Sequence, residues 1–256
     1  MNSFDDLRKK YEADKAASRR VVSIPRAAKS DSDQEKYDEF DKFGEFNLGG
    51  ADLFRAKRYA NDINHGLEVL ENVPKGVSIF GSRFGQEGEA EYDQVRVLGQ
   101  ILAGDGKVVV TGGGPGIMEA ANRGAYETGG ISVGLKIHLA ASFNEPPNPY
   151  LTHAATFQYF FARKIMLVNA ANLFVFFPGG FGTMDEFTEV LVLLQEQKMP
   201  PTPIFLFGSQ YWKPLNDFFA RTMTERGFLN DGDLELYKIT DDINDIVTAA
   251  RQAGTV

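Results

Sequence analysis

Residues 176–187 read FFPGGFGTMDEF, where an apolar run stops at a glycine-rich turn and a helical pattern begins at once. The run 172–177 is typical of a buried strand, and the apolar residues after the turn recur with the spacing of one helix face. Gly179, Gly180 and Gly182 leave the main-chain N–H groups of the turn uncovered by side chains. Together with the first turn of the helix, these amides predict a binding site for an anion, and above all for a phosphate.

A purely structural role is open for part of this stretch. The tetrapeptide TMDE at 183–186 fits a capping box, in which Thr183 caps the helix and Glu186 reaches back to it. Thr183 is therefore either a cap or a phosphate contact. Because a helix needs only one cap, the additional glycines and proline favour a ligand-binding loop.

Composition limits the possible classes of protein. The chain has 256 residues, of which 43% are hydrophobic and 24% charged, enough for one large core. A net charge of -8 argues against nonspecific binding of nucleic acid. The chain has no cysteine, which excludes disulfides and thiolate chemistry. No stretch approaches the roughly 20 apolar residues that span a bilayer, and charges begin at Asp5. We expect a soluble cytoplasmic protein without nucleic-acid or membrane partners.

From residue 77 onward, short apolar runs alternate with amphipathic stretches, which is the pattern of βαβ units. We predict an α/β fold with a Rossmann-like, doubly wound and mainly parallel sheet of about seven strands and helices on both faces. The predicted strands are 77–81, 107–112, 132–136, 152–157, 172–177, 203–207 and 236–240.

The domain organisation follows from where the composition changes. Residues 1–50 carry dense charge of both signs and few aliphatic side chains, which predicts a solvated N-terminal extension. Residues 51–256 are predicted to form a single Rossmann-like domain. Its first element is a helix over residues 51–71, which Pro74 terminates and which packs on the outside of the domain.

Two further strand ends carry unusual turns. Ser82 and Arg83 follow the first strand and supply a hydroxyl and a cation, and Gly113 and Gly114 lie in the turn after the second. In an open parallel sheet, ligands bind beyond the carboxyl ends of the strands. With the turn at 178–183, these segments are predicted to surround a phosphorylated small molecule.

A dinucleotide fits this pattern poorly. The fingerprint G-x-G-x-x-G fails after the first strand, where Arg83 stands two positions after Gly81, and after the second, where Ile117 replaces the last glycine. No acidic residue ends the second strand to hold a ribose diol. The sequence therefore disfavours a dinucleotide such as NAD as the ligand.

Two adjacent cations, Arg163 and Lys164, lie in the segment 157–168, whose apolar residues surround a helix nearly on all sides and predict its burial. Buried cations stay charged only when anions face them. A structural salt bridge is one source of such charge. A bound phosphate together with Glu186 is the other, and we favour it.

Glu119 lies in the first turn of the helix after Gly116, and two roles are open for it. It could form an i, i+4 ion pair with Arg123 or contact a sugar or base at the sheet edge. The three histidines are far apart in the sequence, so no metal site is expected.

Three motifs, GGGPGIMEA at 112–120, FARK at 161–164 and PGGFGTMDE at 178–186, resemble those of the Lonely Guy (LOG) family. The resemblance covers roughly residues 75–230. This family consists of nucleoside 5'-monophosphate phosphoribohydrolases, many relatives of which carry the label "possible lysine decarboxylase". The resemblance implies hydrolysis of the N-glycosidic bond of cytokinin riboside monophosphates or AMP-like nucleotides to free base and ribose 5-phosphate. It also implies a homodimer or larger homo-oligomer that needs neither metal nor cofactor.

The same resemblance assigns roles to residues within a catalytic domain. It implies that Arg163 and Glu186 form the catalytic pair and that the turn at 179–183 holds the phosphate. The predicted substrate-binding residues are Ser82, Arg83, Gly113, Gly114, Glu119, Lys164, Gly179, Gly180, Gly182 and Thr183. Glu119 stands where the plant-type branch has glycine, which leaves the preferred base open.

Two other activities are alternatives to this hydrolase. A nucleotide or molybdenum-cofactor carrier would also need a phosphate cradle, but it would have no need of the pair Arg163 and Glu186. Lysine decarboxylation would need pyridoxal phosphate on a lysine, and Lys164, the best candidate, has Arg163 as its neighbour. The hydrolase is the prediction, and the carrier is the alternative.

Overall fold

The computed structural model describes residues 50–139, 147–230 and 232–253, with side chains from residue 55 onward. The predicted extension thus lies outside the described residues, except for Gly50. The elements are α3 Gly50–Leu70, β1 Gly76–Phe80, α4 Ala90–Gly104, β2 Val109–Thr111, α5 Ile117–Glu127, β3 Ser132–Ile137, β4 His153–Phe157, α6 Phe160–Asn169, β5 Ala171–Phe176, α7 Phe181–Gln195, β6 Ile204–Phe207, α8 Ser209–Asp217, β7 Lys238–Thr240 and α9 Ile243–Gln252. A wider helical stretch, Phe218–Met223, continues α8, and Asp233–Glu235 forms a short 3-10 turn.

A seven-stranded sheet in the order β4-β3-β2-β1-β5-β6-β7 organises the described residues. Every pair of neighbouring strands is parallel. Each predicted strand is present, with ends within three residues of those expected. This parallel sheet with helices on both faces confirms the predicted Rossmann-like fold. The prediction succeeded because short apolar runs that are fully buried between helices are typical of parallel strands.

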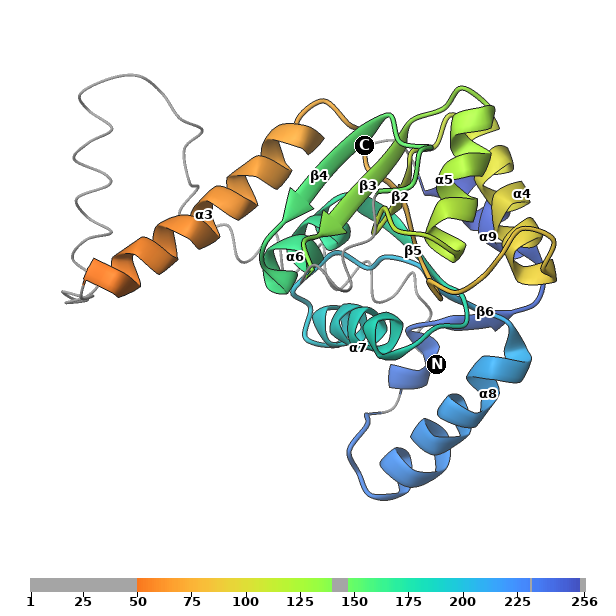
Figure 1. Cartoon of the computed structure of the whole chain (residues 1–256). Helices are drawn as coiled ribbons and strands as arrows, with labels where there is room; N and C mark the ends of the chain where they lie inside the picture. The colour runs from red at the N-terminus through yellow and green to blue at the C-terminus, as the bar shows by residue number, and fades with distance from the viewer. Residues whose placement is uncertain (1–49, 140–146, 231, 254–256) are drawn as a thin grey trace.

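Helices cover both faces of this sheet (Figure 1). On one face, α4, α5 and α9 pack against alternate side chains of β1, β2 and β5 in one buried apolar cluster. On the other, α3, α6, α7 and α8 contribute to a second cluster that contains Trp212. Chain order reverses between β1 and β5, which places the ends of these two strands at the switch point where ligands bind in such sheets.

Helices α4 and α5 approach closely because glycine lies at their contact. A Cβ on Gly124 would collide with the carbonyl oxygen of Arg96, and one on Gly99 would collide with the carbonyl oxygen of Ala121. The small residues of α5 therefore serve the neighbouring helix as well as the sheet.

The prediction that the segment 157–168 is buried on all sides is wrong. In α6, Ala162, Met166 and Leu167 face the core, whereas Phe160, Phe161 and Ile165 are 53%, 40% and 38% exposed. The apolar residues correctly indicated a helix, but their number does not reveal what covers each side of it.

None of the helices in the described residues combines the length and the apolar character that a membrane span requires.

Candidate active site

Three loops meet beyond the carboxyl ends of β1, β2 and β5, and main-chain hydrogen bonds join them. The N–H of Ser82, after β1, donates to the carbonyl of Pro178, after β5, at 2.9 Å. The N–H of Ile117, at the start of α5, donates to the carbonyl of Ser82, also at 2.9 Å. The three loops therefore converge as the sequence predicts. The backbone of Ser82 links the loop after β2 to the loop after β5.

The loop after β5 presents main-chain donors at the start of α7. This helix begins at Phe181, its N-cap is Gly180, and no side chain caps it. Its first internal hydrogen bond runs from the N–H of Met184 to the carbonyl of Gly180, so the preceding amides have no acceptor within the helix. An uncapped helix start is suited to an anion, because its N–H groups and its dipole both favour negative charge.

Thr183 is therefore not the N-cap, because the helix starts two residues before it. The capping-box interpretation is wrong for this residue and for Glu186, which bonds elsewhere. The Thr183 side chain is buried beneath the loop, and a Cβ on Gly179 would collide with it. Gly180 and Gly182, by contrast, border open space.

Arg163 and Glu186 form a close ion pair at this position. Nη2 of Arg163, on α6, donates to Oε1 of Glu186, on α7, at 2.7 Å, and both side chains are 12% exposed. Burial raises the pKa of the Glu186 carboxyl to about 7, although Arg163 acts to lower it. Asp185 and Glu189 act in the same direction as burial, and Lys164 acts with Arg163. Glu186 can therefore gain or lose a proton near neutral pH.

The Arg163 guanidinium also reaches the loop after β2. A Cβ placed on Gly112 would lie 3.2 Å from Nη1 of Arg163, so glycine at this position makes room for the arginine. Nε of Arg163 is buried and donates to no acceptor among the described residues. A buried donor without a partner costs free energy, which is consistent with a ligand that supplies the acceptor.

Lys164 takes different partners from its neighbour. Its Nζ pairs with Asp185 at 3.2 Å and with Glu189 at 3.0 Å, both on α7. Lys164 therefore takes part in structural salt bridges, one of the two roles considered for the adjacent cations. Contact of Lys164 with the substrate stays a prediction. These ion pairs raise the pKa of Lys164, while burial, the largest single influence, opposes them.

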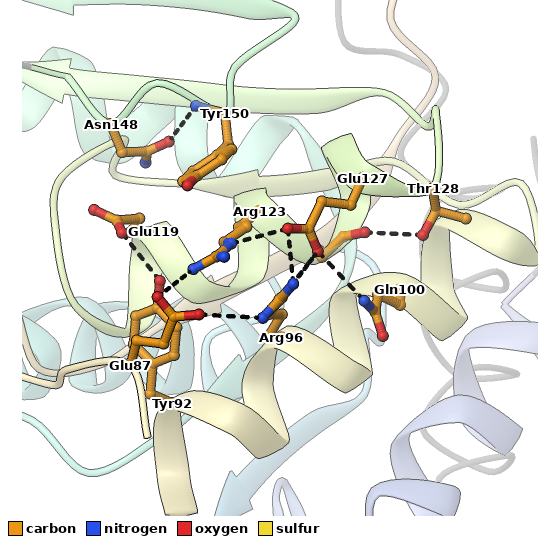
Figure 2. Close-up of polar contacts among 11 residues, drawn as sticks. Glu87, Tyr92, Arg96, Gln100, Glu119, Arg123, Glu127, Thr128, Asn148 and Tyr150 are labelled. Carbon is orange, nitrogen blue, oxygen red and sulfur yellow. Dashed lines mark hydrogen bonds and ion pairs between the residues drawn. The ribbon is translucent and has the colours of Figure 1, made fainter. Parts of the chain in front are cut away.

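Glu119 accepts a hydrogen bond from the Tyr92 hydroxyl at 3.0 Å and does not pair with Arg123 (Figure 2). Arg123 instead pairs with Glu87 at 2.8 Å and Glu127 at 2.9 Å, and its guanidinium lies over the ring of Tyr150. Of the two roles left open for Glu119, the ion pair with Arg123 is not formed, because the carboxylates of Glu87 and Glu127 pair with the arginine. Contact of Glu119 with a sugar or base stays a prediction.

The side chains after β1 take local positions. The Ser82 hydroxyl accepts from the N–H of Phe84 at 3.1 Å, and the Arg83 guanidinium lies over the ring of Phe84. The main chain of Ser82 joins the three loops, and substrate contact of the Ser82 and Arg83 side chains stays a prediction.

Asn148 fixes the loop that contains Gly113 and Gly114, a role that no local sequence pattern indicated. Its N–H donates to the carbonyl of Gly113 at 3.0 Å, and its Nδ2 donates to the carbonyl of Gly114 at 3.1 Å. Nδ2 also lies 3.0 Å from Oδ1 of Asn122, which accepts from the Thr111 hydroxyl at 2.6 Å. Gly113, at φ 68°, needs to be glycine for this turn.

No group of three or more acidic or histidine side chains in the described residues is placed to hold a metal ion. The arrangement instead offers main-chain donors, one buried arginine and one carboxyl whose pKa lies near neutrality.

A family model described as "Possible lysine decarboxylase" matches residues 118–250, just over half of the chain. The chain belongs to this family. The predicted membership of the Lonely Guy family is thereby confirmed, since the matched residues include the motifs of both α6 and α7.

Two of the curated relatives illustrate the activities for which proteins similar to this chain are named. A cytokinin riboside 5'-monophosphate phosphoribohydrolase of Rhodococcoides fascians is 25% identical over 187 residues, which cover 70% of this chain and 90% of that protein. A pyrimidine/purine nucleotide 5'-monophosphate nucleosidase of Escherichia coli is 29% identical over 151 residues, 54% of this chain but only 33% of that protein. The chain thus spans about a third of the nucleosidase.

Solved structures show the same fold at low identity. A molybdenum cofactor binding protein of Rippkaea orientalis aligns with a TM-score of 0.53 at 19% identity, covering 71% of this chain and 98% of that one. The molybdenum cofactor carrier protein of Chlamydomonas reinhardtii aligns at 0.52 and 21% identity, covering 70% and 98%. These likenesses support the fold and do not bear on activity.

We expect Asn148→Ala to lower the free energy of unfolding by about 1–3 kcal/mol, because a buried carbonyl loses its donor. Urea denaturation of the variant and the wild type measures this difference. Asn61→Ala, at an exposed position of α3, is the matched control and is expected to change stability by less than about 0.5 kcal/mol. Equal stability of the two variants would contradict the role assigned to Asn148.

Proposed function

We propose that this protein hydrolyses the N-glycosidic bond of nucleoside 5'-monophosphates to a free base and ribose 5-phosphate. The observation that carries the proposal is the close pair of Arg163 and Glu186 beside an uncapped, glycine-rich helix start. The first feature suits bond cleavage at a sugar carbon, and the second suits the 5'-phosphate.

The phosphate is assigned to the turn at 178–183. Its oxygens accept from the free amides at the start of α7, and Gly180 and Gly182 leave open space beside them. Among the predicted phosphate contacts, Gly179 has a structural task, because Thr183 fills the space where its side chain would stand.

The carboxylate of Glu186 is assigned to the glycosidic carbon. As the C1'–N bond breaks, the base leaves with the bonding electron pair, and positive charge develops on the ribose. A nearby carboxylate stabilises that charge and accepts a proton from the attacking water, whose oxygen forms the new bond to C1'. The departing base takes up a proton, so hydrolysis needs no other reactant.

Arg163 is assigned two tasks. Its Nη2 holds the Glu186 carboxylate, and its charge favours the ionised form of that group. Its buried Nε lacks an acceptor among the described residues, and a ribose or phosphate oxygen supplies one in the proposed complex.

The named activities of the relatives support this choice of reaction. Both the Rhodococcoides fascians and the Escherichia coli proteins are named for action on nucleoside 5'-monophosphates. One name specifies a cytokinin and the other a pyrimidine or purine, so AMP, CMP and isopentenyladenosine monophosphate are the substrates to compare. The proposed substrates are intracellular phosphorylated compounds, and a cytoplasmic location belongs to the same proposal.

We also propose a homodimer or larger homo-oligomer. Phe160, Phe161 and Ile165 of α6 are exposed, and Val192 of the adjoining helix α7 is 53% exposed. A second copy that covers these side chains would remove their apolar surface from water. Light scattering on the purified protein is expected to give at least twice the chain mass of 28.3 kDa, and a monomer at every concentration would refute this part.

Incubation of the wild type with each nucleotide is expected to release free base, detected by chromatography. Glu186→Gln is expected to bind AMP with similar affinity but to lower kcat by about 100-fold or more, because the neutral amide cannot accept the proton of water. Calorimetric titration measures the affinity.

Asp185→Asn is the matched control, because it neutralises an exposed carboxylate one residue away. This variant is expected to keep most of the activity. Binding of AMP without base release by the wild type would point to the carrier alternative, and full activity of Glu186→Gln would remove that residue from the mechanism.

The reaction is expected to depend on pH through Glu186. Because the carboxylate is the active form and its pKa is about 7, kcat/KM should rise from pH 5.5 and level off above about pH 8. A raised pKa means that the folded state binds the proton more tightly than the unfolded one, so wild-type stability relative to Glu186→Gln should fall between pH 4.5 and about 7. Rates and urea unfolding measured across this range check both statements, and a flat rate profile would contradict the first.

A further inference from the structure

Helix α6, which carries Arg163, has no cap of its own. Its N-cap residue is Tyr159, and no side chain from its own first turn accepts a hydrogen bond there. The two main-chain N–H groups that lead into α6, those of Gln158 and of the N-cap Tyr159, are bound instead by Asp62 of α3, a carboxylate that lies 96 residues before Gln158 in the chain. Oδ2 of Asp62 accepts from the N–H of Gln158 and from the N–H of Tyr159, both at 2.9 Å, and Oδ1 lies 3.2 Å from the N–H of Gln158.

The contact between α3 and α6 is closely fitted. The ring of Tyr59 packs edge-on against Tyr159 at 4.5 Å and against Phe161 at 5.0 Å between centroids. Gly66 lies against Met166, where a Cβ would collide with the methionine. Asp62 lies between these contacts and is 8% exposed. A buried carboxylate needs hydrogen-bond partners, and the amides at the start of α6 provide them.

A short series of bonds connects Asp62 to the proposed catalytic pair. Asp62 holds the N–H of Tyr159, and the carbonyl of Tyr159 accepts from the N–H of Arg163 at 3.2 Å. The Arg163 side chain in turn holds Glu186. The start of α6 is therefore held at two points, by the Asp62 carboxylate of α3 at Tyr159 and by the Glu186 carboxylate of α7 at Arg163.

We propose that Asp62 is a positioning residue, which fixes the first turn of α6 so that the Arg163 guanidinium meets Glu186 in its reactive geometry. The inference rests on the proposed function. It makes α3 part of the catalytic unit, although α3 lies outside the residues 118–250 that the family model matches.

The charge of Glu186 gives a readout that a purely structural role would not move. The groups that influence it are Arg163 and Lys164 from α6, and Asp185 and Glu189 from α7. Burial is the largest cause that raises this pKa, and Arg163 opposes it. When the first turn of α6 loosens and Glu186 stays buried, Arg163 moves away and its lowering effect weakens, so the pKa of Glu186 rises. Loss of the Asp62 negative charge acting directly through space would lower that pKa instead.

Four full-length variants test the proposal. Asp62→Ala removes the acceptor, and Asp62→Ser makes the side chain too short to reach the N–H groups of Gln158 and Tyr159. Both variants are expected to lower kcat about tenfold or more. KM should change little, because the phosphate-binding turn is untouched. Asp62→Asn loses the charge but keeps an acceptor oxygen, and should retain most of the wild-type kcat. Glu68→Ala removes an exposed carboxylate from the same helix and is the control.

Carbon-13 NMR of protein labelled in its glutamate carboxyl groups follows the titration of Glu186, whose signal is assigned by its absence in Glu186→Gln. The midpoint is expected to rise in Asp62→Ala and Asp62→Ser and to stay near the wild-type value in Asp62→Asn. Wild-type kcat and midpoint in folded Asp62→Ala would overturn the proposal, and so would a lowered midpoint. If Asp62→Ala does not fold, equal kcat in the Ser and Asn variants overturns it.

The titration also separates this inference from the proposed function. If the wild type releases no base from any nucleotide, the proposed function fails. A raised Glu186 midpoint in Asp62→Ser would still support the positioning of Arg163 by Asp62, and an unchanged midpoint would overturn it.

Discussion

The ion pair between Arg163 and Glu186 is the interaction on which the rest of the site depends. It joins α6 to α7 at a place where both side chains are largely withdrawn from water. Withdrawal of one charge from water is costly, and two opposite charges compensate each other only when their geometry is good. The sheet supplies that geometry, because it brings the starts of two helices, separated in sequence by β5, to the same edge.

The loops around this pair are held mainly by backbone contacts and buried amides. Ser82 links the loops after β2 and β5 through its main chain, and Asn148 holds the carbonyls of Gly113 and Gly114. Such contacts fix the path of the chain without occupying the space that a ligand needs. Donors held in advance lose little entropy when an anion binds, which is the physical basis of a preorganised site.

Sequence reasoning reached the fold and the convergence of the three glycine-rich loops because both rest on local patterns. Apolar runs gave the strands, and glycine-rich turns marked the strand ends that converge. It could not find Asp62 or Asn148, whose partners lie 96 and 34 residues away and leave no local signal. It also misplaced the start of α7, which begins two residues before Thr183 and has no side-chain cap. The carboxylate of Glu119 bonds Tyr92, 27 residues away in the chain, and not the nearby Arg123.

The position of α3 affects whether strands of other molecules can pair with the edge of the sheet. β4 is one of the two edge strands of the sheet, and its side chains at His153, Ala154 and Thr156 are exposed. An unpaired strand edge is a template for intermolecular strand addition and fibrous aggregation. Helix α3 runs alongside β4 (Figure 1), with Gly66 against Phe157. The long helix therefore obstructs that edge and helps keep the sheet from growing by recruitment of foreign strands.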